Sequence, residues 1–342
     1  MIALTGGGTG GHLEVVRLLQ AAFYRRGIAT IFIGSAHGQD RGWFEGDRGF
    51  ADTYFLPTRG VVDRGPLKSL LSLAMIARAS LTAAAILKRH GIGAVVNVGS
   101  YVAAPASFAA VLCRIPLFVH EASAKPSPLT LMLRRHTAGY FNSYGAPSPV
   151  TDFPVDQAFF DAARTRRQVK RVIFLGGSQG AMFINDFALA CAPALTQSGI
   201  AITHQTGWRD FERVRAGYRA IGVEADVFAF DRAIVARMAA ADLAVSRAGG
   251  GTLWELVANG LPTLFVPFPH AARDHQYHNA RFLADRGLGF VTRQSALNLE
   301  RLRAVIAADL HAISTGLMRL VRPGGAGRIA DYIMNWISGQ GR

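Results

Sequence analysis

Short apolar runs alternate along this chain with longer segments in which apolar residues recur every three or four positions. The runs are bounded by Gly, Pro or polar residues, which is typical of strands buried in a parallel sheet. In the first half we expect strands at 2–4, 30–34, 53–56, 94–98 and 117–120, and helices at 13–26, 67–90 and 104–113. In the second half we expect strands at 171–175, 200–205, 225–230, 243–246, 263–268 and 289–291, and helices at 184–192, 234–241, 252–259 and 275–285. This alternation predicts an α/β protein with two doubly wound parallel-sheet domains and a cleft between them.

The domain boundary is predicted from a polar segment that contains Pro147, Pro149 and Pro154. A length of 342 residues suits two domains of ordinary size. We therefore expect domains at 1–155 and 156–325. A final helical segment, 326–342, follows a Pro-Gly-Gly break and is expected to pack back toward the first domain.

Composition narrows the class of protein. Half of the residues are hydrophobic and 18% are charged, so both halves can bury a core. A net charge of +14 is consistent with an anionic partner, but no run of Lys and Arg with interleaved aromatics is present, so nucleic acid is not expected.

We expect no signal peptide, because Met1 leads directly into the first strand. Cys113 and Cys191 lack metal-like spacing and are interpreted as reduced core residues.

The longest apolar stretch, 69–87, is interrupted by Arg78 and so does not predict a membrane span. Its large apolar residues follow helical spacing from Leu70 to Leu81, and basic residues flank it at Arg64, Lys68, Lys88 and Arg89. One interpretation is a helix packed on a sheet. The other is an apolar patch, ringed by positive charge, that rests on an anionic membrane.

Two glycine-rich turns follow short apolar strands, at 6–11 and at 176–181. A strand, a glycine turn and a helix start present backbone N–H groups and the positive end of a helix dipole, which suits a phosphate. One such turn can also serve only for tight packing. Two of them, about one domain length apart, indicate two nucleotide-binding folds.

A third glycine turn, 246–252, precedes Glu255 one turn into a helix. Glu255 could accept hydrogen bonds from a ribose diol, or it could favour the helix dipole. Further on, His275 and His278 could be metal ligands, but no clustered carboxylate or Cys completes a site, so no metal is expected.

Two histidines in the first half are candidates for proton transfer. His12 closes the first glycine turn and could act as a general base or donate to a phosphate. His120 and Glu121 end a strand, where they could be a catalytic pair or a buried hydrogen-bonded pair.

Together these segments resemble the MurG family, N-acetylglucosaminyltransferases that convert lipid I to lipid II in peptidoglycan synthesis. The matching segments run in order over nearly the whole chain, at 6–12, 99–102, 120–121, 176–181, 204–207, 246–255, 260–268 and 276–280. The resemblance implies a GT-B fold, with UDP-N-acetylglucosamine on the C-terminal domain and lipid I on the N-terminal domain. It also implies a peripheral protein on the cytoplasmic face of the bacterial cell membrane, contacts with other cell-wall synthesis proteins, and neither cofactor nor obligatory metal.

The resemblance further implies an inverting single displacement, for which the candidate catalytic residues are His12 and Glu121. The residues implied on the acceptor side are Thr9, Gly10, Gly11, Tyr101, His120 and Ser123. Those implied for UDP-N-acetylglucosamine are Gly177, Ser178, Gln179, Gly249, Thr252, Glu255, Gln276 and Asn279.

Several positions depart from the family pattern. Ala122 and Ser123 replace a Gln-Asn pair, Ser127 and Thr130 replace a Gly and an Asn, and Ser100 replaces a Gly. Asp156 replaces a basic residue, and Asp231 replaces an apolar one. Two alternatives therefore stay open: another UDP-sugar GT-B enzyme with a lipid acceptor such as diacylglycerol, and a non-catalytic basic membrane-binding protein with a vestigial nucleotide cleft.

Overall fold

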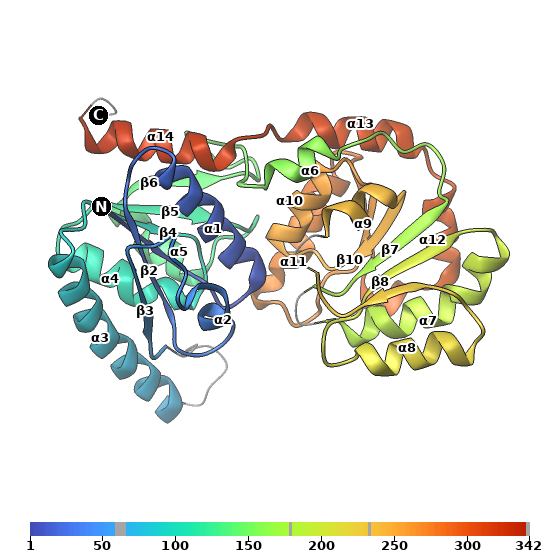
Figure 1. Ribbon diagram of the computed structural model, residues 1–342, viewed down its shortest axis with the longest axis horizontal. Coiled ribbons are helices and arrows are strands. Elements are labelled where there is room, and N and C mark those ends of the chain that lie inside the picture. The colour runs from blue at the N-terminus through green and yellow to red at the C-terminus, as the bar shows by residue number, and fades with distance from the viewer. Residues whose placement is uncertain (59–65, 178–179, 232–233, 340–342) are drawn as a thin grey trace. The chain divides into compact units, whose positions relative to one another are not determined.

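The computed structural model describes residues 1–58, 66–177, 180–231 and 234–339, and the side chains of residues 66–71 fall outside this description. The chain divides into two compact units, shown in Figure 1. Unit 1 comprises Met1–Pro154 and Gly324–Arg342, and unit 2 comprises Val155–Pro323.

Unit 1 is built on a six-stranded parallel sheet in the order β3-β2-β1-β4-β5-β6. Its strands are β1 (Ile2–Thr5), β2 (Thr30–Ser35), β3 (Asp52–Leu56), β4 (Ala94–Asn97), β5 (Leu117–Glu121) and β6 (Thr137–Asn142). Its α-helices are α1 (Gly10–Tyr24), α2 (Asp40–Phe44), α3 (Pro66–Arg89), α4 (Ala104–Leu112), α5 (Pro128–Leu133) and α14 (Gly325–Ile337).

Unit 2 repeats this architecture, with a second six-stranded parallel sheet in the order β12-β11-β10-β7-β8-β9. Its strands are β7 (Arg171–Leu175), β8 (Ala201–Gln205), β9 (Asp226–Phe228), β10 (Leu243–Ser246), β11 (Thr263–Phe265) and β12 (Phe290–Val291). Its α-helices are α6 (Gln157–Asp161), α7 (Met182–Gln197), α8 (Phe211–Ala220), α9 (Val235–Ala240), α10 (Gly250–Ala258), α11 (His275–Ala284), α12 (Leu299–Ile306) and α13 (Leu310–Leu320).

The prediction of two doubly wound parallel-sheet domains is confirmed, and every predicted strand forms near its expected position. Strand β11 is shorter than predicted and ends at Phe265, two residues before Pro267, which has no N–H to donate to a ladder. The structure adds elements that the apolar pattern did not predict, namely β6, α2, α5, α6, α8, α12 and α13.

Helices cover the first sheet. On one face, α3 and α4 lie side by side and enclose an apolar core with the buried residues of β1, β2, β4 and β5 (Figure 1). Helix α14 packs against α1, so the end of the chain becomes part of unit 1 (Figure 1). Its Trp336 ring meets the Phe118 ring of β5 edge-on, at 5.5 Å between centroids.

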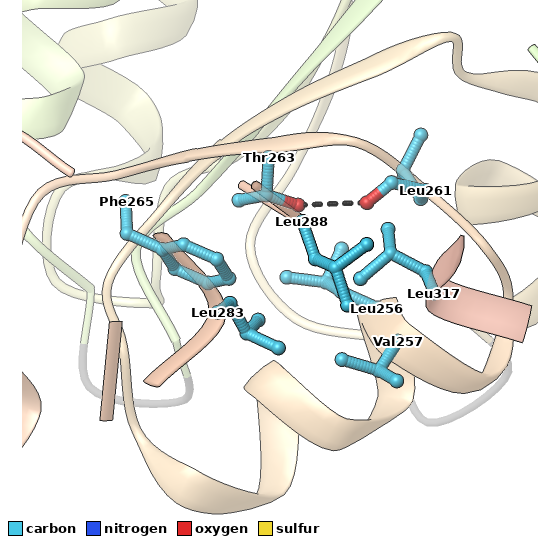
Figure 2. A pocket seen from close by; sticks show the side chains of 8 residues that line it. All are labelled: Leu256, Val257, Leu261, Thr263, Phe265, Leu283, Leu288 and Leu317. Atoms are coloured by element: carbon cyan, nitrogen blue, oxygen red, sulfur yellow. Dashed lines mark hydrogen bonds between the residues drawn. The ribbon is translucent and has the colours of Figure 1, made fainter. Parts of the chain in front are cut away.

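The core of unit 2 is shown in Figure 2, where leucines from α10, α11 and α13 surround Phe265 of β11. The gap between these side chains is too small to hold a water molecule. The Thr263 hydroxyl is buried there and donates to the Leu261 carbonyl at 2.9 Å, which satisfies its hydrogen-bonding capacity within apolar surroundings (Figure 2).

Within the described residues, no single helix is both long and apolar enough to cross a membrane. One bent pair, Leu299–Ile306 with Leu310–Ile337, meets the criteria of length and composition only when its two parts are joined.

Candidate functional site

The first glycine turn connects β1 to α1 and lies close to the end of β4. A Cβ on Gly6 would approach the Val98 Cγ2 atom to 2.6 Å and the Gly99 carbonyl oxygen to 2.9 Å, and Gly6 has a φ of +130°. Neither the space nor the backbone angle suits a side chain. This turn therefore brings the α1 N-terminus to the carboxyl edge of the sheet, where ligands of such folds bind.

Thr9 and His12 are joined within this turn. The Thr9 Oγ1 and His12 Nδ1 atoms are 2.8 Å apart, and Thr9 makes no side-chain cap on α1. The opposite ring nitrogen of His12, Nε2, lies close to the chain at Gly99, where an added Cβ would be only 3.0 Å from it. Glycine at position 99 thus leaves room for the imidazole, which is half-buried between the two turns.

The side chain of His120 is buried, whereas a side chain that binds a ligand must be accessible to it. Its side chain is 1% exposed, and its ring packs edge-on against Phe153 at 5.0 Å between centroids. Neither ring nitrogen has a hydrogen-bond partner among the described residues. Burial, together with the nearby His12, lowers the pKa of His120 to about 3, so the ring is neutral at physiological pH. In this structure His120 is therefore covered by the protein, although the sequence resemblance places it on the acceptor side.

The Glu121 carboxyl group is also buried, at 4% exposure. It accepts hydrogen bonds from the Ser127 amide at 3.1 Å, from the Ser123 amide and from the Thr130 side chain. Burial raises the pKa of Glu121 above its usual value, although these hydrogen bonds oppose the shift. The carboxyl group therefore holds the segment that connects β5 to α5.

Two departures from the family pattern lie in that segment and have a local structural role. The Ser127 Oγ atom caps α5 by accepting from the Thr130 amide at 3.1 Å, and it lies 3.0 Å from the Thr130 hydroxyl. Ala122 is buried, and Ser123 is half-buried. The segment is thus held internally by the side chains that replace the family's Gly and Asn.

The third departure, Ser100, has a strained backbone. Its φ of 72° and ψ of 157° fall in a region that is used almost only by glycine. Its neighbour Tyr101 begins a short 3₁₀ helix and is 44% exposed. The strained residue therefore lies between Gly99, which adjoins His12, and an exposed aromatic ring.

The second glycine turn, after β7, is equally constrained. A Cβ on Gly176 would lie 2.6 Å from the Ala181 nitrogen, and one on Gly180 would lie 2.5 Å from the Thr206 carbonyl oxygen. Gly177 has a φ of +77° and open space around it. Ser178 and Gln179 lie outside the described residues.

His204, in the matching segment 204–207, is buried beneath this turn. Its Nδ1 atom lies 2.9 Å from the Tyr218 hydroxyl, and its Nε2 atom lies 3.0 Å from the Asn185 Oδ1 atom. Asn185 in turn donates to the Thr206 carbonyl at 3.1 Å. Burial lowers the pKa of His204 to about 3, so this histidine is a neutral structural group.

The third glycine turn is held from behind by α11. The Gln276 Oε1 atom accepts from the Ala248 amide at 3.3 Å and from the Phe268 amide at 3.0 Å. Asn279 is fully buried and donates to the Ala248 carbonyl at 3.0 Å. In this structure Asn279 is therefore covered, and its amide holds the third glycine turn.

Gly249 is the N-cap residue of α10, and Thr252 and Glu255 follow in the first two turns of that helix. All three are half-buried, and the position of Gly249 has open space where a side chain would lie. Gly249, Thr252 and Gln276 thus lie around the third glycine turn, at the carboxyl edge of the second sheet. Glu255 lies one turn further along α10.

The two acidic departures both have partners. Asp156 caps α6 by accepting from the Ala158 amide at 3.0 Å. Asp231 forms an ion pair with Arg237, which also pairs with Asp226 and lies over the Phe228 ring. The negative charge at position 231 is therefore balanced within unit 2.

Two charged residues near these turns were not singled out from the sequence. Arg247 donates to the Val266 and Pro267 carbonyls at 2.9 and 3.2 Å, and burial lowers its pKa to about 10. Asp40 lies beneath the first glycine turn and is fully buried. A charged residue immediately after a buried strand, as in Arg247, is a sequence signal for such a role; Asp40 offers none, because it lies five residues beyond β2.

A pocket of about 370 Å³ opens at the carboxyl edge of the second sheet, between the start of α7 and the loops after β11 and β12. It is lined by Phe183, Pro267, Pro269, Arg293, Gln294 and Ser295. Across the described part of the chain, no group of three or more His, Cys, Asp or Glu side chains is arranged to hold a metal ion.

The chain matches two domain families over most of its length. Residues 2–138 match the glycosyltransferase family 28 N-terminal domain, and residues 171–318 match the glycosyltransferase family 28 C-terminal domain. The crystal structure of Acinetobacter baumannii MurG has a TM-score of 0.78 at 24% identity and covers 98% of this chain and 99% of its own. This similarity shows the fold, and it confirms the expected GT-B fold, with one parallel-sheet domain in each unit.

Several relatives in sequence are named UDP-N-acetylglucosamine--N-acetylmuramyl-(pentapeptide) pyrophosphoryl-undecaprenol N-acetylglucosamine transferase. The Wolinella succinogenes protein of this name is 49% identical over 334 residues, covering 98% of this chain and 99% of its own length. The protein from Campylobacter jejuni strain 81-176 is 43% identical over 326 residues, covering 95% of each. The chain therefore belongs to glycosyltransferase family 28, with the N-terminal and C-terminal domains of that family in order.

Proposed function

We propose that this protein transfers N-acetylglucosamine from UDP-N-acetylglucosamine to the 4-hydroxyl of the muramyl unit of lipid I, giving lipid II. The relatives that carry this activity in their names match the chain from end to end. The structural observation that carries the proposal is the Thr9–His12 pair, held at 2.8 Å on a glycine turn at the carboxyl edge of the first sheet.

His12 is the proposed general base. When its Nδ1–H donates to the Thr9 hydroxyl, the lone pair of a neutral imidazole is on Nε2, which is the tautomer that a base requires. Nε2 takes the proton of the acceptor hydroxyl as its oxygen attacks the anomeric carbon. The bond between that carbon and the β-phosphate oxygen breaks, UDP leaves with the bonding electrons, and the anomeric configuration inverts.

Glu121 is the other candidate base, and its contacts favour a different role. Three donors from the 123–130 segment occupy its carboxyl group, which is buried. A carboxylate engaged in this way would have to release the loop before it could accept a substrate proton. We therefore propose that Glu121 keeps Ser123 and its neighbours in place for the acceptor.

Unit 2 is the proposed donor-binding unit. The α10 N-terminus, capped only by Gly249, presents backbone N–H groups and the positive end of its dipole to the diphosphate. Glu255 is proposed to accept from the ribose hydroxyls, and Gln276 to reach the N-acetylglucosamine hydroxyls. The same dipole stabilises the negative charge that develops on the departing UDP, and this step needs no metal.

The membrane-facing surface is proposed on α3. Leu73 and Leu81 are eight residues apart on one face of this helix and are 53% and 66% exposed. Arg78, Lys88 and Arg89 are exposed along the same helix. Arg64 and the side chains of Lys68, Leu70 and Leu71, which the sequence also places in this stretch, lie outside the described residues. Exposed leucines among basic side chains support a peripheral location on the anionic cytoplasmic face of the bacterial cell membrane.

A transfer assay tests the proposed reaction. Radiolabelled UDP-N-acetylglucosamine is supplied with a short-chain lipid I analogue or with diacylglycerol, and calorimetric titration measures UDP binding. Transfer to the lipid I analogue alone supports the proposal. Transfer to diacylglycerol alone would indicate another lipid glycosyltransferase, and absence of both transfer and UDP binding would indicate a vestigial cleft.

A further inference from the structure

The Asp40 carboxyl group joins the first glycine turn to the end of β2 at the carboxyl edge of the first sheet. Its Oδ1 atom accepts from the Gly8 amide at 2.8 Å, and its Oδ2 atom accepts from the Ser35 amide at 2.8 Å. Gly8 lies in the first glycine turn, whereas Ser35 ends β2. One carboxyl group thus ties the glycine turn to the neighbouring strand end.

Glycines on both sides leave space for this carboxyl group. A Cβ on Gly7 would lie 2.4 Å from the Asp40 Oδ2 atom, and a Cβ on Gly34 would lie 2.9 Å from the same oxygen. Either side chain would displace the carboxyl group. Gly7 in the glycine turn and Gly34 in β2 thus both leave room for the buried acid, and Gly34 also leaves room for the Phe32 ring.

Burying an acid in this place is costly. Asp40 is fully buried, and within the described part of the chain it has no ion pair. Burial raises the pKa of Asp40, and the amide hydrogen bonds only partly offset that effect. An uncharged or apolar residue would avoid the cost of burying a charge. What the Asp40 carboxyl group provides in return is a fixed position for the Gly8 amide.

We infer that Asp40 is a positioning residue for the transfer, and that it acts by holding the Gly8 amide and thereby the orientation of the Thr9–His12 pair. Gly8 immediately precedes Thr9, whose hydroxyl contacts the His12 ring. Asp40 itself is covered and touches no substrate. A small displacement of a catalytic group lowers the rate of the chemical step far more than it changes binding. This inference rests on the proposed function of His12.

The test compares Asp40→Asn with the native enzyme and with His12→Ala. An asparagine keeps the shape but offers one acceptor in place of two, so either the Gly8 amide or the Ser35 amide loses its partner. We expect kcat to fall about tenfold or more, with the KM for UDP-N-acetylglucosamine within about twofold of native, because the donor binds to unit 2. In the His12→Ala background the same substitution should lower kcat by less than about twofold, because the group that it positions is gone.

Asp47→Asn is the matched control. The Asp47 Oδ1 atom also accepts a backbone amide, that of Gly49 at 2.8 Å, but Asp47 is exposed and lies away from the glycine turn. Its substitution should leave kcat unchanged. If Asp40→Asn does not fold, Asp40→Ser provides the same comparison with space for a water molecule in place of the carboxyl group.

Three results would overturn the inference: native kcat in Asp40→Asn, an equal loss of kcat in the native and His12→Ala backgrounds, or a rise in the donor KM as large as the loss of kcat. Each of these results differs from a failure of the proposed function. If the proposed function is wrong, the native enzyme itself does not transfer N-acetylglucosamine to the lipid I analogue.

Discussion

Arg26 and Asp331, which are 305 positions apart in the chain, form a two-point ion pair. The Arg26 Nε atom lies 2.6 Å from Asp331 Oδ1, and its Nη2 atom lies 2.7 Å from Oδ2. Arg26 also donates to the Gly327 carbonyl at 3.0 Å. The start of unit 1 is thus joined to the helix that ends the chain, and the hydrogen bond from Arg26 lowers the pKa of Asp331.

The first prediction concerns what holds α14 in place. Asp331 is 58% exposed in its side chain, so we expect Asp331→Asn to lower the free energy of unfolding by no more than about 1 kcal/mol. Ile333 is fully buried, and Ile333→Ala should cost about 2–4 kcal/mol through lost burial and the cavity left behind. Urea unfolding followed by circular dichroism measures both variants.

The pH dependence of the ion pair has a definite sign. Because the folded-state pKa of Asp331 is lowered, its contribution is complete above the unfolded value of about 3.9 and is lost as the pH falls through the folded value. The difference between native protein and Asp331→Asn should therefore shrink under acid conditions. An equal cost for Asp331→Asn and Ile333→Ala at neutral pH would mean that the ion pair, and not apolar burial, dominates.

The second prediction separates the two candidate bases. His12→Ala should lower turnover by roughly a hundredfold or more, with donor affinity nearly unchanged. Glu121→Gln leaves one acceptor oxygen in place of two, which weakens the hold on the 123–130 segment, so it should mainly raise the KM for the acceptor. Kinetics with both substrates varied provide the measurement. The assignment fails if Glu121→Gln abolishes turnover while His12→Ala loses only acceptor affinity.

The third prediction concerns the donor. Glu255→Ala should weaken UDP binding by about 1–3 kcal/mol, because buried ribose hydroxyls would lose their acceptor. Calorimetric titration with UDP measures this. Glu212→Ala is the control, since Glu212 is 72% exposed in its side chain on α8 and pairs with Arg215. Unchanged UDP affinity in Glu255→Ala would show that Glu255 only complements the helix dipole.

The fourth prediction concerns the membrane. Sedimentation with vesicles that contain anionic lipids should exceed sedimentation with neutral vesicles, and added salt should reduce the difference. A double substitution, Leu73→Ser with Leu81→Ser, should weaken binding, whereas Ile221→Ser, at a 42% exposed position in unit 2, should not. If the protein sediments equally with both kinds of vesicle and salt has no effect, electrostatic attraction does not contribute to membrane binding.

The fifth prediction concerns the strained serine. Ser100→Gly removes a backbone strain of about 1–3 kcal/mol, partly offset by the greater chain entropy of glycine, for an expected net gain of about 1 kcal/mol. Ser100→Ala keeps the Cβ atom and should not stabilise the protein. Thermal unfolding compares the two variants, and equal gains would show that the hydroxyl, and not the backbone angle, is unfavourable.

Some elements could not be predicted because their signals depend on partners far away in the chain. Strand β6 is an example: Gly139 weakens its apolar pattern, yet a Cβ there would lie 2.9 Å from the Phe118 ring and 3.1 Å from the Tyr332 ring of α14. The glycine thus leaves room for the Phe118 ring of β5 and for the Tyr332 ring of a helix almost two hundred positions later. Strand β12 is only two residues long and half-buried, and it lies within the strand predicted at 289–291.

The sequence by itself determined the two parallel sheets, the three glycine turns and the family, because apolar spacing and glycine placement are local properties that each segment carries. Only the tertiary structure decided which of the polar groups near these turns are buried and which stay accessible. His120 and Asn279 resemble ligand-binding residues in sequence but are buried, whereas Asp40 gave no signal and proved to underlie the first glycine turn. Burial and hydrogen bonding depend on segments that are distant in the chain, and a local pattern does not contain them.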